Sequence, residues 1–155
     1  MKKREITLLI GLLAADQLTK YWIASTLPLY DSIEIIPNFF WLTYLRNTGA
    51  AWSLLEGQMG LFLLLASAAM IGMGYIFFTS KKTNKILRYA LIFMFVGTLG
   101  NFIDRAVFGY VRDFLSFNTF GYMFPVFNVA DMSLNVGAGL LILDAFLERK
   151  HEWKT

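Results

Sequence analysis

The sequence lacks cysteine, contains a single histidine and carries few charged side chains. Without cysteine there is no disulfide framework, no thiolate nucleophile and no thiolate metal site. The only histidine, His151, lies near the C-terminus among charged residues, so it cannot form a Ser-His triad in a core. We therefore expect neither a metal nor a cofactor. Any chemistry must use carboxylates, lysine, arginine, asparagine, tyrosine or hydroxyl groups.

The low charge content indicates a membrane protein. Charged residues make up 16% of the 155-residue chain, hydrophobic residues 57% and aromatic residues 17%. A soluble domain contains about 25% charged residues. The mean hydropathy of +0.53 points the same way, and the length allows one domain. We predict a single integral membrane domain over residues 1–155.

The positive charges are clustered beside apolar runs. Ten of the fourteen lysines and arginines fall in three groups. These groups are Lys2, Lys3 and Arg4; Lys81, Lys82, Lys85 and Arg88; and Arg149, Lys150 and Lys154. A sequence pI near 9.2 also fits nucleic-acid binding, but basic groups that flank apolar runs are typical of the cytoplasmic side of membrane proteins. We therefore place all three groups in the cytoplasm and expect no nucleic-acid partner.

Four apolar runs are long enough to cross a bilayer: residues 6–27, 58–79, 87–108 and 129–148. A helix of 22 residues extends about 33 Å, at 1.5 Å per residue. The first run also resembles a secretory signal peptide, but Asp16 and Lys20 interrupt it and no small-residue cleavage site follows. We predict an all-α membrane protein with four transmembrane helices and both termini in the cytoplasm.

Two outer segments, 28–57 and 109–128, connect these runs and differ in composition. The first is rich in β-branched and aromatic residues, which predicts a small extracytoplasmic β-structure. Trp41 and Trp52 in it suit the membrane interface. The second is aromatic and has few charges, which favours a short interfacial helix, with a strand as the alternative. We expect its aromatic side chains to form a mobile cover over a bound substrate.

Six polar residues lie where the sequence is otherwise typical of a membrane span: Asn101, Asp104, Arg105, Asp113, Asn128 and Asp131. A charge in hydrocarbon costs roughly 2.5–3.5 kcal/mol on insertion scales, so such residues usually serve a function. The first three follow the helical spacing i, i+3 and i+4, so they share one helix face. Asn128 is suited to cap the fourth helix.

Asp113 and Asp131 lie at the outer end of the predicted bundle, at similar depth. Two neighbouring carboxylates share a proton, because both cannot easily ionise. One can activate water while the other protonates a carbonyl oxygen, which is peptide hydrolysis without a covalent intermediate. We expect Asp131, in a first helical turn, as the carboxylate and Asp113, in an apolar segment, as the protonated partner. The alternative is that each aspartate caps a helix or pairs with Arg105 or Arg112.

Asp16 and Lys20 are four residues apart in the first run, so they share a helix face. They either neutralise each other during insertion or support an active site. Intramembrane charges also occur in transporters and proton relays, and a non-enzymatic scaffold protein is a further alternative. A relay predicts titratable groups through the whole membrane, whereas the inner halves of the second to fourth helices have almost none.

Five motifs occur in a specific order: DQLTK (16–20), RNTGAAW (46–52), GNFIDR (100–105), VRDF (111–114) and FNVAD (127–131). Together they resemble the lipoprotein signal peptidases, or type II signal peptidases. The resemblance implies an aspartic endopeptidase of the bacterial cytoplasmic membrane, with its active site near the extracytoplasmic face. Its substrates would be prolipoproteins with a diacylglyceryl group on a cysteine, cut just before that cysteine. Membrane lipids would be further partners, and we expect a monomer.

The resemblance also assigns roles to residues. The catalytic pair falls on Asp113 and Asp131. Supporting polar residues fall on Asp16, Lys20, Asn47, Asn101, Arg105 and Asn128, and Asp104 has a structural or supporting place. Arg112 is expected not to matter. The family fold would add a β-cradle in the first outer segment and a small amphipathic helix in the second.

Overall fold

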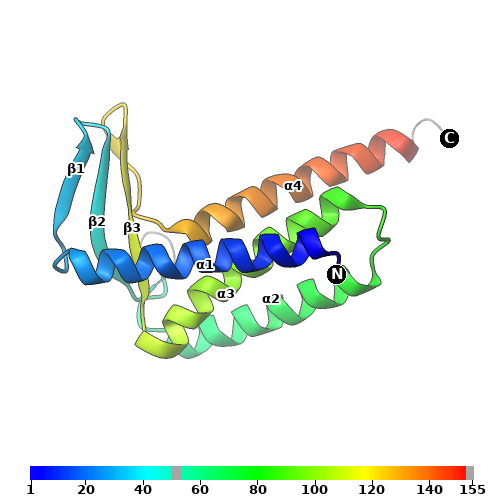
Figure 1. Cartoon of the computed structure of the whole chain (residues 1–155), viewed down its shortest axis with the longest axis horizontal. Helices are drawn as coiled ribbons and strands as arrows, with labels where there is room; N and C mark the ends of the chain where they lie inside the picture. The colour runs from blue at the N-terminus through cyan, green and yellow to red at the C-terminus, as the bar shows by residue number, and fades with distance from the viewer. Residues whose placement is uncertain (50–53, 153–155) are drawn as a thin grey trace.

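The computed structural model describes residues 1–49 and 54–152 (Figure 1). Trp52 and Lys154, which the sequence placed at the interface and in the cytoplasm, lie outside the described residues. The described chain forms α1 (Lys3–Thr26), β1 (Ser32–Ile36), β2 (Phe40–Asn47), α2 (Met59–Thr79), α3 (Lys85–Phe108), β3 (Val111–Thr119), β4 (Tyr122–Met123) and α4 (Val129–Glu152). The four predicted apolar runs correspond to these helices, with ends that differ by a few residues.

The helices lie side by side, with the sheet across one end of the bundle and both termini at the other (Figure 1). Glycines bring α3 and α4 together at backbone distance. A Cβ atom on Gly137 of α4 would lie 2.9 Å from the backbone oxygen of Ala90, and one on Gly97 of α3 would overlap the backbone oxygen of Ala130. The close approach places the first turn of α4 against α3.

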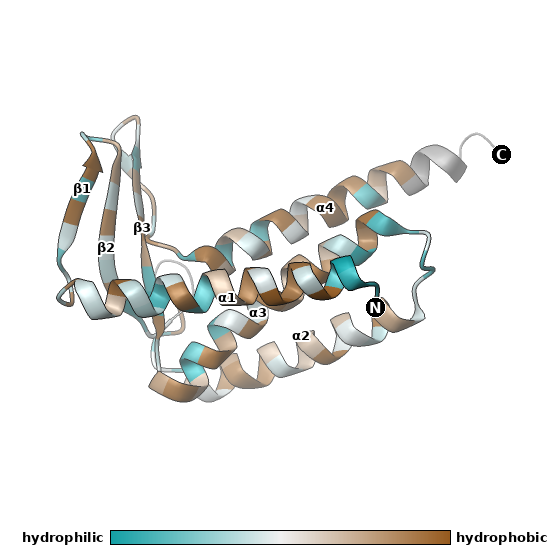
Figure 2. Cartoon of the chain, viewed as in Figure 1, coloured by the Kyte–Doolittle hydropathy of each residue, from teal (hydrophilic) through white to brown (hydrophobic). Residues whose placement is uncertain are grey.

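Within the described residues, three helices are long and apolar enough to cross a membrane: α2, α3 and residues 129–147 of α4. Hydrophilic residues gather near both ends of α3, with apolar residues between them (Figure 2). α1 has 24 residues, but Asp16, Gln17 and Lys20 reduce its hydropathy. The protein is thus mostly helical with a small antiparallel sheet, and a fourth span stays a prediction.

The sheet is antiparallel, with strand order β1-β2-β3-β4. β1 and β2 confirm the predicted β-structure. The predicted interfacial helix in residues 109–128 is wrong, because this segment forms β3 and β4. The reason is non-local: β2 offers an edge of unpaired backbone groups, and β3 pairs with it so that Leu45 lies opposite Asp113 and Asn47 opposite Val111.

The sheet is fixed to the bundle by an apolar cluster. Ile23 and Leu27 at the end of α1 pack with Tyr44 of β2 and Phe114 of β3, and all four are buried. Phe114 directly follows Asp113 and points the other way along the strand. Packing of Phe114 therefore turns Asp113 to the opposite face of β3.

At the end that carries the termini, Arg88 joins three helices. Its guanidinium donates to Glu5 of α1 through Nε, at 2.8 Å from Oε1, and through Nη2, at 3.1 Å from Oε2. Nη1 donates to the backbone oxygen of Phe77 near the end of α2, at 3.0 Å. Arg88 is buried, so it differs from the exposed lysines of the basic group to which the sequence assigned it.

Candidate active site

Asp113 and Asp131 line one cavity of about 580 Å³. Asp113 is the third residue of β3, and Asp131 lies in the first turn of α4. The bundle contributes residues of α2, α3 and α4 to the cavity wall, and residues 124–127 contribute the opposite side. The structure therefore brings together the two aspartates that the sequence singled out.

Asp113 is almost fully buried, and two asparagines donate to its carboxyl group. Asn47 Nδ2 lies 2.9 Å from Oδ2, and Asn128 Nδ2 lies 2.6 Å from Oδ1. The register of β2 and β3 brings Asn47 to Asp113. Phe127 pairs with Leu115 of β3 through backbone hydrogen bonds, and this pairing brings Asn128 to the same carboxyl group.

Asp131 takes part in the N-cap of α4 and also faces the cavity. Asn128 Oδ1 accepts from the Asp131 backbone N–H at 3.0 Å, and Asp131 Oδ2 accepts from the Asn128 N–H at 3.1 Å. This reciprocal pattern is a capping box, so the predicted cap by Asn128 is confirmed. The other carboxylate oxygen of Asp131 accepts from Asn101 Nδ2 at 2.7 Å.

Two asparagines connect the pair of aspartates. Asn128 contacts both aspartates, and its Nδ2 atom also lies 3.2 Å from Asn101 Oδ1. Lys20 Nζ donates to the same Asn101 oxygen at 2.9 Å. With its oxygen occupied by donors, Asn101 must present its Nδ2 group to Asp131, so the network determines the orientation of each amide.

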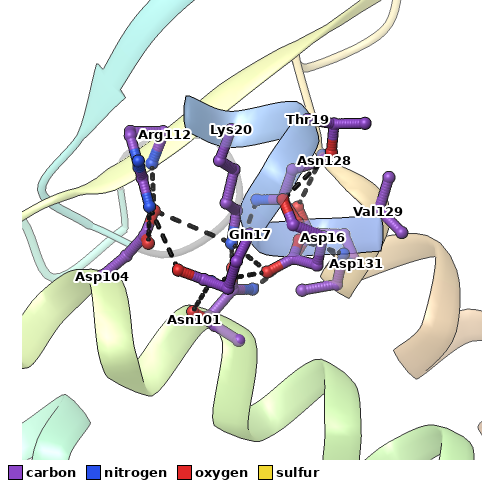
Figure 3. A network of polar contacts seen from close by, with 12 residues as sticks. Asp16, Gln17, Thr19, Lys20, Asn101, Asp104, Arg112, Asn128, Val129 and Asp131 are labelled. Atoms are coloured by element: carbon purple, nitrogen blue, oxygen red, sulfur yellow. Dashed lines mark hydrogen bonds and ion pairs between the residues drawn. The ribbon is translucent and has the colours of Figure 1, made fainter. Parts of the chain in front are cut away.

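Lys20 and Asp16 form a fully buried ion pair of 2.9 Å beside Asn101 (Figure 3). Asp16 Oδ1 also accepts from the backbone N–H of Ala130 at 2.8 Å, and Lys20 lies 3.7 Å from Asp104. The structure confirms that the two side chains pair, and support of an active site stays a prediction. The two charges compensate each other, and they also position the first turn of α4 and Asn101.

Arg112 has a structural place that the sequence did not predict. Its side chain is buried and donates to Asp104 twice, from Nη2 to Oδ1 at 2.7 Å and from Nε to Oδ2 at 3.1 Å (Figure 3). Its Nη2 also lies 3.2 Å from Gln17 Oε1, and Gln17 in turn donates to Asp16 at 2.9 Å. The expectation that Arg112 does not matter was wrong. Gln17 was also missed, although it lies within the DQLTK motif.

Arg105 contributes a positive charge to the cavity wall. Its Nη2 donates to the backbone oxygen of Gly49 at 2.9 Å, and its guanidinium stacks 4.7 Å from the ring centre of Phe62. The Nε atom is buried and has no hydrogen-bond partner among the described residues. Arg105 therefore brings a guanidinium charge to the cavity, held in place by Gly49 and Phe62.

The protonation of Asp113 reflects its surroundings. Burial, followed by the negative charge of Asp131, raises the pKa of Asp113 from 3.8 to about 7, although hydrogen bonds from Asn47 and Asn128 oppose the rise. Asp113 can therefore keep a proton near neutral pH. Among the described residues, no three His, Cys, Asp or Glu side chains are grouped as a metal site requires.

Residues 8–147 match the family described as signal peptidase (SPase) II. The chain belongs to the signal peptidase II family. Lipoprotein signal peptidases of Staphylococcus aureus strains bovine RF122 / ET3-1 and MRSA252 are each 45% identical over 128 residues, which cover 83% of this chain and 78% of each relative.

Two solved structures have the same fold as this signal peptidase II family member. Both are described as bacterial membrane enzymes, solved by the in meso method at 2.3 Å and 1.9 Å resolution. The first has a TM-score of 0.89 and 41% identity, covering 95% of this chain and 89% of the other. The second has a TM-score of 0.83 and 42% identity, covering 90% of each chain. The chain is thus a membrane peptidase, and a transporter or proton relay is not favoured.

Proposed function

We propose that this peptidase removes the signal peptide from diacylglyceryl-modified prolipoproteins, with Asp113 and Asp131 as a catalytic dyad. It cuts just before the lipid-carrying cysteine. The observation that carries the proposal is the shared cavity, in which Asn128 contacts both aspartates. The family membership supplies the substrate class, and the cavity supplies two acids beside space for a peptide.

The two aspartates divide the acid and base roles. Asp113, with its pKa raised to about 7, donates its proton to the oxygen of the scissile carbonyl. Asp131 accepts hydrogen bonds from Asn101 and from the backbone of Asn128, which stabilise a negative charge, and it takes a proton from the attacking water. The new carbon–oxygen bond gives a tetrahedral intermediate. In its collapse the proton held by Asp131 passes to the leaving amine, the carbon–nitrogen bond breaks, and one hydroxyl group of the intermediate returns its proton to Asp113, which restores the starting state of the pair.

The surrounding residues position this pair. Asn47, Asn101 and Asn128 orient the carboxyl groups. Asp16 and Lys20 position Asn101 and the start of α4 from behind, and Asp104 with Arg112 fixes the beginning of β3. Arg105 contributes the positive charge of its guanidinium to the cavity wall, beside the space for a substrate carbonyl oxygen. A network with this many hydrogen bonds limits movement of the acids during the reaction.

The membrane position follows from the substrate. A lipid-modified peptide stays in the bilayer, whereas the aspartates need water, so the cavity must lie near a membrane surface. We place the sheet end outside the cell, the termini in the cytoplasm and α1 as a fourth span. Single cysteines at Ser32 and Thr83 should then react with an impermeant reagent from opposite sides in intact cells. Labelling of both from outside would exclude this arrangement.

A purified-enzyme assay tests the function. A synthetic precursor peptide with a diacylglyceryl cysteine should be cut before that cysteine, and the same peptide without lipid should be cut far more slowly. Asp113→Asn and Asp131→Asn should each lower cleavage by about 10²–10⁴-fold while the protein still inserts and melts normally. Equal cleavage of the two peptides would overturn the substrate assignment, and near-normal activity of either variant would overturn the dyad.

A further inference from the structure

A second cavity lies at the opposite end of the bundle from the aspartates. It has a volume of about 170 Å³ and is lined almost entirely by apolar atoms. Leu9 of α1 and Gly74 and Phe78 of α2 form its walls, and Leu91 and Phe95 of α3 form its floor. α1 and α2 both pack against α3 here, through the buried cluster that contains Phe77, Leu91 and Ile92. The cavity is therefore an apolar groove between α1 and α2.

The groove opens sideways, towards the surroundings of the bundle. Phe78 on its wall is 76% exposed, although the adjacent Phe77 is buried. In a membrane-spanning bundle, this outer wall faces lipid chains. With a volume of about 170 Å³, the groove suits part of a hydrocarbon chain better than a helix of a partner protein, whose diameter is about 10–12 Å.

Basic residues lie in the chain segments that adjoin this groove. Met1 lines the cavity, so the first residues of the chain lie beside it. The exposed basic residues on the adjoining chain are Lys2, Lys3, Arg4, Lys81, Lys82 and Lys85. Within the described residues none of these six forms an ion pair, and the nearby carboxylate of Glu5 is occupied by Arg88. The chain segments next to the apolar slot, here called its basic rim, therefore carry unneutralised positive charge.

We propose that this groove is a binding site for an anionic phospholipid. One acyl chain lies between α1 and α2, and the phosphate group contacts the lysines that follow α2 and precede α3. An apolar slot beneath a basic rim matches an amphiphile with a negative head. The site is independent of the aspartate cavity and of the cleavage reaction, because its residues lie at the other end of the helices.

Gly74 offers a direct way to close the groove. A Cβ atom on Gly74 would meet nothing within 4 Å, and Gly74 lines the cavity, so a leucine there is expected to fill the slot. Gly72 provides a matched control, because a Cβ atom on it also meets nothing within 4 Å and it does not line the cavity. Both changes add the same side chain to the same helix.

The test uses the full chain, with phosphatidylglycerol or phosphatidylcholine added to the detergent-solubilised protein. Native mass spectrometry should detect one retained phosphatidylglycerol and far less phosphatidylcholine, and phosphatidylglycerol should raise the melting temperature by a few degrees. Gly74→Leu should reduce the retained lipid several-fold and remove the rise in melting temperature. Gly72→Leu should leave both unchanged.

A second variant tests the rim and does not depend on Gly74→Leu folding. Changing Lys81, Lys82 and Lys85 together to Gln should remove the preference for phosphatidylglycerol, with cleavage of the lipidated peptide retained. Equal retention of the two lipids by the unchanged protein would overturn the proposal. So would equal loss in the two glycine variants, because general lipid contact would then explain the binding.

Discussion

Two groups of buried charges lie at opposite ends of this bundle, and they differ in what faces them. At the termini end, Glu5 and Arg88 form a bidentate pair, and Arg88 also donates from Nη1 to a backbone oxygen. At the sheet end, Asp16 and Lys20 form a pair that is buried more completely, but the asparagine beside them contacts a carboxylate that lines a large cavity.

The difference shows that burial of charge alone does not mark a site. The Glu5–Arg88 pair satisfies its own hydrogen bonds and joins three helices, as a structural pair does. The group at the sheet end instead contacts Asn101, and Asn101 and Asn128 contact each other and the two aspartates. Both aspartates line a large cavity. Chemistry is therefore expected where a satisfied charge network ends at an open cavity.

The largest expected effect concerns the acids at the sheet end. Asp113→Asn or Asp131→Asn should lower kcat by about 10²–10⁴-fold, the usual size of a general acid or base contribution. The double variant should cost little more than either single one, because the two groups act as a unit. Steady-state cleavage of the lipidated peptide measures this. Additive losses would show that the two aspartates act separately.

The corresponding change at the termini end should affect stability and leave catalysis intact. Arg88→Met leaves Glu5 without its partner, and loss of one member of a buried pair costs about 3–5 kcal/mol. Thermal unfolding in detergent should show the loss, while the folded fraction keeps its normal kcat. Glu5→Leu combined with Arg88→Met should recover much of the stability. A loss of kcat without destabilisation would remove the contrast between the two ends.

The pH dependence of kcat/KM and of thermal stability tests the protonation of Asp113 at the sheet end. Above pH about 7 this group loses its proton, so kcat/KM should fall on the alkaline side as the acid is lost. Burial raises the pKa of Asp113 from 3.8 to about 7. The protonated side chain of Asp113 therefore contributes fully to the stability of the folded state below pH 3.8, and this contribution is lost as the pH rises through about 7. Melting curves should therefore depend less on pH in Asp113→Asn. An unchanged dependence would show that Asp113 is ionised throughout.

The smallest expected effect concerns the hairpin between β3 and β4. Phe120 has a left-handed backbone with φ of 54° and is fully exposed. Such a conformation costs a bulky residue roughly 1–2 kcal/mol, and asparagine tolerates it better. Phe120→Asn should raise stability slightly but increase KM, if the aromatic segment covers the bound substrate as predicted. Phe120→Leu, which keeps the strain and the apolar surface, serves as the control, and an unchanged KM in Phe120→Asn would exclude the cover.

The sequence alone determined the helices and the polar residues of the candidate site. Apolar runs set helix positions locally, because a helix satisfies its own backbone hydrogen bonds and needs only a continuous apolar stretch in a membrane. Polar residues stand out against such a background. For this reason Asp113, Asp131, Asn128 and Asn101 could be selected without any knowledge of their contacts, and the cap by Asn128 could be predicted from its place before α4.

Only the tertiary structure decided the secondary structure and the contacts of the segment after α3. Residues 111–119 form a strand because the edge of β2 lies beside them, and no local pattern reveals such an edge. In the sequence, Arg112 and Arg88 cannot be distinguished from solvated arginines. Their structural role becomes visible only through their ion pairs with the buried carboxylates of Asp104 and Glu5. The need for glycine at Gly97 and Gly137 likewise depends on how closely the partner helix approaches. Pairing, burial and close approach are relations between distant residues, so they are determined only when the chain has folded.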